Sequence, residues 1–259
     1  MRKLLIAATL FVATQVNAQI KTPQASLKSE IDQAVGLTNV SVDYFRPAKK
    51  GRLVFGDLVP YGKMWRTGAN QNTVIEIDTD IEINGKNLPA GKYALYTLPK
   101  AESWDVIIYK TTDNWGLPQT WNESDVVMKT AVKPQTLNKD VEYFTIDVTP
   151  QNNEQGTIDI SWEKTIVHVP FKVPTHKIAM ESINSSINEN SKESDYYAAG
   201  VYLFTSNTDV KKALDYVNKS ITMQNGEAPF YMLRQKSLIQ AANGDKKGAV
   251  ETAKKSLEA

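Results

Sequence analysis

The spacing of apolar residues changes near residue 173, and this change predicts two kinds of structure along one chain. Before it, short runs alternate apolar and polar residues and end at turn-forming residues. In the clearest run, 75–83, an acidic residue occupies every even position, and Asn84-Gly85 then gives a tight-turn signal. We predict about nine strands, which include 40–44, 75–83, 92–98, 104–109, 125–132, 141–148, 157–162 and 165–173.

Strands at this spacing, with no long helices between them, favour an antiparallel sandwich or barrel over residues 19–174. A parallel α/β sheet would need crossover helices, which this part of the sequence lacks. The segment 92–98 is apolar or aromatic on both faces, so we expect it to be a central strand.

After Pro174 the apolar spacing is helical, which predicts an α-helical tail over residues 175–259. Two segments, beginning at Asp209 and Asp245, align at a spacing of 36 residues. This arrangement resembles tetratricopeptide repeats, which are helical hairpins of about 34 residues. Because two hairpins alone bury little apolar surface, we expect a helix at 176–188 to cap them or the β-rich part to cover them.

The first eighteen residues have the pattern of a cleaved secretory signal peptide. Arg2 and Lys3 precede a short apolar run, and Val16-Asn17-Ala18 supplies small residues for cleavage. The apolar run is too short for a membrane-spanning helix, so we expect Gln19–Ala259 to be periplasmic or extracellular, without membrane insertion. The chain has no cysteine, which excludes disulfides and thiol chemistry.

Charge gives no support for a nucleic-acid partner. The formal net charge is +1, and loss of Arg2 and Lys3 changes it to −1. Binding to a polyanion requires an excess of basic residues, which this total does not provide.

The segment 59–70 is a dense mixture of polar and aromatic residues and is the first candidate ligand-binding site. It contains Trp65, Arg66 and Asn70, and Arg46 and Arg52 precede it within twenty-one residues of Arg66. Guanidinium groups suit carboxylates, phosphates or buried carbonyls. We therefore predict ligand binding by Trp65, Arg66, Asn70 and Arg46, with loop-tying by Arg66 as the alternative.

Trp115 and Trp121, in the polar loop 111–124, form the second candidate. Exposed tryptophans provide flat surfaces for sugar rings or other apolar faces. The alternative is that this loop buries its own aromatic residues.

The sequence predicts no catalytic residue, no metal site and no cofactor. His168 and His176 lack a nucleophile motif, and no G-x-S-x-G turn is present. The acids Glu76, Asp78, Asp80 and Glu82 could bind calcium or act as glycosidase carboxylates. Their alternation with isoleucine instead favours a solvated sheet face opposite lysines, and Ile83 stands where an EF-hand loop requires glycine.

Five segments of this sequence, taken in order, resemble the sequence motifs of one protein family. They are 33–36 (QAVG), 44–47 (YFRP), 51–56 (GRLVFG), 60–70 (PYGKMWRTGAN) and 88–93 (LPAGKY). Together they resemble the domain-of-unknown-function family numbered 2911, which comprises secreted bacterial proteins common in Bacteroidetes. The resemblance covers roughly residues 20–173 and implies export, but it supplies neither an activity nor catalytic residues.

Two functions from different classes therefore remain open. The favoured one is a noncatalytic binding module for a small molecule, glycan or peptide, with a helical tail that docks a protein partner. The alternative is a carboxylate-dependent, glycosidase-like hydrolase that acts on an envelope or extracellular polymer. Two carboxylates about 5–10 Å apart across a deep cleft would favour the hydrolase.

Overall fold

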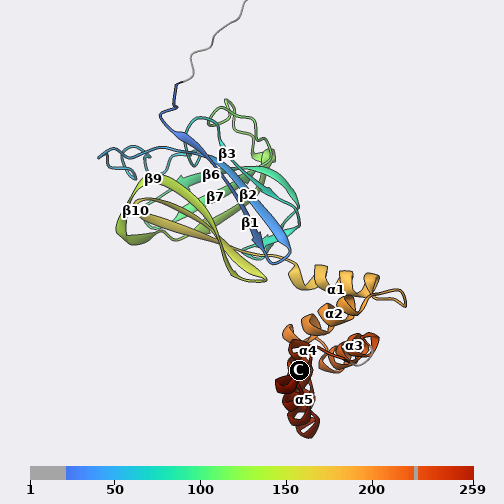
Figure 1. Cartoon of the computed structure of the whole chain (residues 1–259). Coiled ribbons are helices and arrows are strands. Elements are labelled where there is room, and N and C mark those ends of the chain that lie inside the picture. The colour runs from blue at the N-terminus through green and yellow to red at the C-terminus, as the bar shows by residue number, and fades with distance from the viewer. Residues whose placement is uncertain (1–21, 225–226) are drawn as a thin grey trace, which may run out of the picture.

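A computed structural model describes residues 22–224 and 227–259, so the predicted signal peptide lies outside the described residues. The described residues form ten strands followed by five α-helices (Figure 1). The strands are β1 Leu27–Val35, β2 Thr38–Arg46, β3 Thr73–Ile77, β4 Ile81–Ile83, β5 Lys86–Leu88, β6 Gly91–Pro99, β7 Trp104–Tyr109, β8 Val126–Val132, β9 Gln135–Asn152 and β10 Gln155–Lys172. The helices are α1 Thr175–Ser186, α2 Glu193–Thr205, α3 Val210–Met223, α4 Phe230–Ala242 and α5 Lys246–Glu258, and a 3₁₀ turn spans Glu123–Asp125.

The strands form two open antiparallel sheets, which confirms the predicted β-rich fold and excludes the closed barrel for the described residues. One sheet has the order β1-β2-β3-β6-β7-β8 and the other β5-β4-β10-β9. Side chains from both sheets, such as Val42, Ile75, Ile146 and Ile160, share one apolar core. The strand β6 is interior to its sheet, as predicted, with Leu95 in this core and Tyr96 in a smaller cluster on the opposite face.

The prediction of one strand over 75–83 is wrong. The chain leaves β3 at Ile77 and enters β4 of the other sheet at Ile81. The isoleucines of both strands are nevertheless buried, because the inner faces of the two sheets contact the same core. The period-two pattern therefore identified the buried face correctly but could not show that the strand changes sheet.

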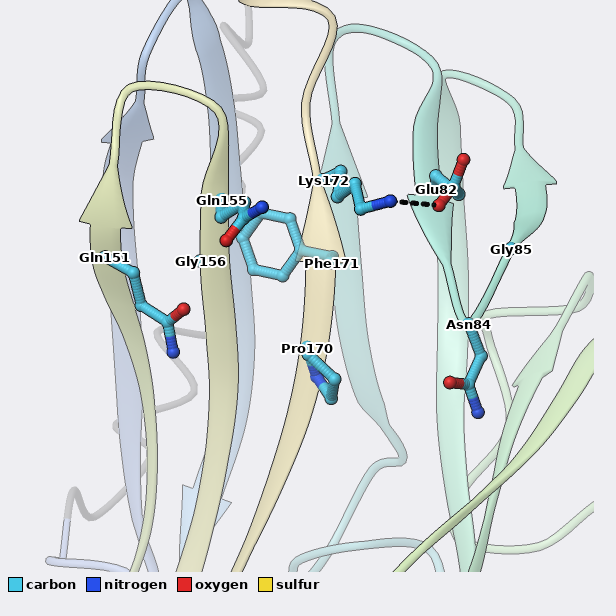
Figure 2. A pocket seen from close by; sticks show the side chains of 9 residues that line it. All are labelled: Glu82, Asn84, Gly85, Gln151, Gln155, Gly156, Pro170, Phe171 and Lys172. Carbon is cyan, nitrogen blue, oxygen red and sulfur yellow. Dashed lines mark hydrogen bonds and ion pairs between the residues drawn. The ribbon is translucent and has the colours of Figure 1, made fainter.

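The predicted strands 157–162 and 165–173 fall within β10, which doubles back on itself around Glu163. Glu163 has φ +54°, and His168 Nδ1 lies 2.7 Å from Asp159 Oδ1 across the bend. Figure 2 shows Gly156 and Phe171 on these neighbouring arms. A Cβ on Gly156 would lie 2.8 Å from the Phe171 ring, so the missing side chain makes room for it.

The helices follow Lys172 as two hairpins preceded by α1 (Figure 1). Leu203 of α2 packs with Ala213 and Val217 of α3, and Met180 of α1 contacts the same cluster. Asp209 accepts a hydrogen bond from the Lys212 backbone N–H, and Asp245, 36 residues later, accepts one from the Gly248 N–H. The aligned aspartates are thus equivalent N-caps of α3 and α5. No helix among the described residues has the length and apolar character needed to cross a membrane.

Candidate functional site

Residues 47–72, between β2 and β3, form a long segment that is fixed to strand β6. The Trp65 N–H donates to the Thr97 carbonyl at 2.7 Å, and the Thr97 N–H donates back at 3.0 Å. The Gly62 N–H donates to the Pro99 carbonyl at 2.8 Å. Since β3 pairs with β6 only as far as Leu95, Trp65 continues the sheet beyond β3. The segment is therefore held by sheet hydrogen bonds, although it forms no named strand or helix.

Trp65 is half-buried and belongs to an aromatic cluster at the edge of the core. Its ring stacks on Trp162 with centroids 6.0 Å apart, and it meets Phe144 edge-on at 5.0 Å. Phe55 and Trp104 also meet it edge-on. Trp65 therefore has a packing role, and only its remaining surface is open to a ligand.

Two cavities meet this segment, and we refer to them together as the loop cleft. The larger cavity has a volume of about 440 Å³ and the smaller one about 370 Å³. Both are lined by Leu58, Val59, Trp65 and Arg66. The larger one also contacts Lys50 and Arg52, and the smaller one contacts Lys63, Met64, Trp115, Gly116 and Leu117.

Arg66 both ties its loop together and lines the cleft. Its Nη1 donates to the Asn70 carbonyl at 2.9 Å. A Cβ on Gly116 would lie 2.9 Å from the same Nη1, so the guanidinium lies directly against the Gly116 backbone. Asn70 contributes this carbonyl, while its side chain reaches toward Gln24 Oε1 at 3.4 Å and does not line either cavity.

The backbone next to Arg66 is strained. Thr67 has φ +55°, a region that β-branched residues rarely occupy, and Asn70, a residue type that tolerates this region, has φ +56°. Thr67 is fully buried, its hydroxyl lies 3.0 Å from Thr97 Oγ1, and its carbonyl accepts from Thr73 Oγ1 at 2.6 Å. Such conformations cost about 1–3 kcal/mol and persist where the surroundings fix them, often at binding sites.

The two tryptophans of the second candidate loop have different environments. Trp121 packs on Tyr109 and Tyr96, with ring centroids at 4.5 and 5.5 Å, and its indole N–H donates to Glu123 Oε1 at 2.9 Å. Trp115 is 71% exposed. The self-packing alternative therefore describes Trp121, whereas Trp115 presents an open aromatic surface at the cleft.

The loop that carries Trp115 is anchored on both sides of it. The Asn72 N–H donates to the Asn114 carbonyl at 3.2 Å, and the Tyr96 hydroxyl donates to the Gly116 carbonyl at 3.3 Å. Burial raises the pKa of Tyr96 from its ordinary value of 10.0 to about 12, so the hydroxyl keeps its proton even in alkaline solution. Trp115 is thus an exposed ring on a fixed backbone.

Arg46 lies elsewhere and has a structural role. Its Nε donates to the Phe144 carbonyl at 3.0 Å, and its Nη2 donates to Thr145 Oγ1 at 2.7 Å, which joins β2 to β9. Of the six candidates, Trp65, Arg66 and Trp115 line the loop cleft, Asn70 flanks it, and Arg46 and Trp121 do not line it. Lys50 and Leu58 lie outside the predicted segment 59–70 and were missed, and Lys63 lies within that segment but was not among the candidate residues. Irregular segments carry no periodicity that predicts which side chains converge.

The four acids of 75–83 do not form a site, because the chain changes sheet between them. Each makes a separate contact: Glu76 with Lys92 at 3.2 Å, Asp78 with the Asn39 N–H at 2.8 Å, Asp80 with the Ala90 N–H at 2.9 Å, and Glu82 with Lys172 at 3.0 Å. The Ala90 hydrogen bond lowers the pKa of Asp80 below its ordinary value. Within residues 22–224 and 227–259, no cluster of three or more His, Cys, Asp or Glu could hold a metal.

The two histidines also lie outside the loop cleft. His168 contacts Asp159 across the bend of β10, and His176 Nδ1 lies 3.2 Å from the Tyr202 hydroxyl. Neither lines one of its two cavities.

Another cavity, of about 380 Å³, lies on the four-stranded sheet (Figure 2). Its polar lining includes Asn84, Gln151 and Gln155, and its two charged residues, Lys172 and Glu82, form an ion pair across it at 3.0 Å. Since these charges neutralise one another, this cavity offers less to a charged ligand than the loop cleft does.

Comparison with protein families matches residues 26–171, more than half of the chain, to a family described as "Protein of unknown function (DUF2911)". Comparisons with curated proteins and with solved structures find no significant match.

Proposed function

We propose that this chain, which belongs to the DUF2911 family of proteins of unknown function, is a noncatalytic binding protein whose ligand site is the loop cleft. The ligand would be a small molecule, a glycan or a short peptide. The observation that carries the proposal is the largely exposed ring of Trp115, on an anchored loop, which lines the smaller of the two cavities. An exposed aromatic ring on an anchored backbone, next to cationic side chains, is suited to holding a ring-bearing ligand, because the backbone is already ordered before binding.

We do not propose the hydrolase. Among the described residues, neither cavity of the loop cleft is lined by an acidic side chain, and the acids of 75–83 are engaged separately. A glycosidase-like mechanism needs two carboxylates facing one bond.

We also propose that the protein is exported by cleavage after Ala18, to the periplasm or beyond, and that the tetratricopeptide-like tail docks a protein partner. The signal-like residues 1–18 and the equivalent caps of α3 and α5 support these proposals. An intact mass that begins at Gln19 would support export, and recovery of the uncleaved chain would contradict it.

The test of the binding function is a thermal-shift screen of the full chain with neutral and charged sugars, metabolites and short peptides. A ligand that binds the native state raises the melting temperature. Each hit is then measured with Trp115→Ala and with a matched control, Phe230→Ala, which removes another exposed aromatic ring on α4. Affinity lost only in Trp115→Ala supports the proposal. Absence of any hit, or hits that both variants bind normally, would place the function elsewhere.

A further inference from the structure

The loop cleft is lined by four cations and, among the described residues, by no acid. Lys50 and Arg52 line the larger cavity, Lys63 lines the smaller one, and Arg66 lines both. None of the four forms an ion pair within residues 22–224 and 227–259. Their positive charge is therefore not cancelled by a direct carboxylate contact.

Three acids beside this segment are engaged by other groups of the loop, and Asp57, which lies within the segment, lines neither cavity. Asp140 pairs with Lys49 Nζ, Glu142 accepts the Lys50 backbone N–H at 2.9 Å, and Glu163 accepts the Val54 N–H at 3.2 Å. None of the three lines a cavity of the cleft. They hold the backbone in place and leave the side-chain charges of the cleft available.

Both guanidinium groups are oriented by carbonyl oxygens rather than by carboxylates. Arg52 Nε donates to the Lys49 carbonyl at 2.8 Å and its Nη2 donates to the Ala48 carbonyl at 2.7 Å. Arg66 Nη1 donates to Asn70 in the same way. A carbonyl oxygen orients the guanidinium group without neutralising its charge. Because a guanidinium has five N–H donors, some donors remain for an anionic ligand.

From this arrangement we infer that the ligand is a small ring-bearing anion, with a carboxylate or phosphate held by the arginines and a ring on Trp115. This inference rests on the proposed binding function and adds the charge of the ligand to it. The exposed side chains of Leu58 and Leu117 beside Trp115 supply the apolar surroundings of the ring. Cations that converge without acidic partners favour an anion, and an aromatic face favours a ring.

The experiment keeps the ring constant and changes only the charge. Glucose, glucuronate and glucose 6-phosphate are titrated into the full chain by calorimetry at 50 mM and 300 mM NaCl. We expect at least one acid to bind tenfold or more tightly than glucose at low salt, with this advantage reduced at high salt because exposed charges are screened. Preference between the two acids distinguishes a carboxylate site from a phosphate site.

A charge-matched pair of variants locates the effect. Arg52→Gln/Lys63→Gln removes two cations from the cleft, and Lys247→Gln/Lys254→Gln removes two from α5. The first should abolish the advantage of the acid over glucose, and the second should leave it unchanged.

Three outcomes would overturn the inference: equal affinity for glucose and both acids, no binding of any of the three, or equal loss in both double variants. The proposed function fails separately. A neutral ligand from the screen that is lost in Trp115→Ala would keep the binding site and refute its anion preference.

Discussion

Trp65 and Trp115 line the same cavity, yet their replacement by alanine should affect stability very differently. Trp65 stacks on Trp162 and meets three further rings edge-on, whereas Trp115 is 71% exposed. Loss of a buried large aromatic costs about 3–5 kcal/mol, and Trp65 is only half-buried, so we expect about 3 kcal/mol for Trp65→Ala. A surface substitution such as Trp115→Ala should change the free energy of unfolding by about 0.5 kcal/mol or less.

The positions of the tryptophans allow the two parts of the chain to be followed separately during unfolding. All five tryptophans precede residue 175, so tryptophan fluorescence during urea unfolding reports on the β-rich part, while circular dichroism at 222 nm reports mainly on the helices. Trp65→Ala should shift the fluorescence midpoint without a change in slope, and Trp65→Phe should recover part of the loss. A cost below about 1 kcal/mol for Trp65→Ala, or a cost for Trp115→Ala that equals it, would refute the assignment of one ring to packing and the other to binding.

Four further results are expected. Arg46→Met should cost about 1–3 kcal/mol, because two partly buried acceptors lose their donor, and should leave ligand affinity unchanged; altered affinity at full stability would show that Arg46 belongs to the site. Gly200→Ala should destabilise the helices by about 1–3 kcal/mol at 222 nm and spare the fluorescence transition, since its Cβ would lie 2.8 Å from Val217 Cγ2; a stabilised tail would show that the hairpin can adjust. Asp80 has a lowered pKa, so its contribution to stability is present at neutral pH and is lost as the pH falls through that folded-state value. The stability difference between wild type and Asp80→Asn should therefore shrink in acid, and a difference that grows would reverse the sign. Residues 19–174 alone should keep a cooperative fluorescence transition, and an unfolded fragment would show that the helices complete its core.

The sequence by itself determined which residues of the strands and helices are buried. Side chains alternate along a strand and recur every three to four residues along a helix, so the isoleucines of 75–83 and the caps Asp209 and Asp245 could be predicted from local pattern. These features depend on backbone geometry within a few residues, and the predicted β-then-α order was confirmed for the same reason. The family resemblance, which rests on sequence segments shared in order, was confirmed as well.

Only the tertiary structure decided which side chains meet. The acids of 75–83 share one pattern but separate, because the chain changes sheet between Ile77 and Ile81. Trp115 and Trp121 stand in one loop, yet the second packs on Tyr96 and Tyr109 and is partly buried, while the first is exposed. Contacts of this kind join residues far apart in the chain through irregular segments. No local periodicity encodes them. The four cations of the cleft come from one irregular segment, 50–66, and it is the pairing of Trp65 with Thr97 of β6 that fixes where this segment lies on the sheet.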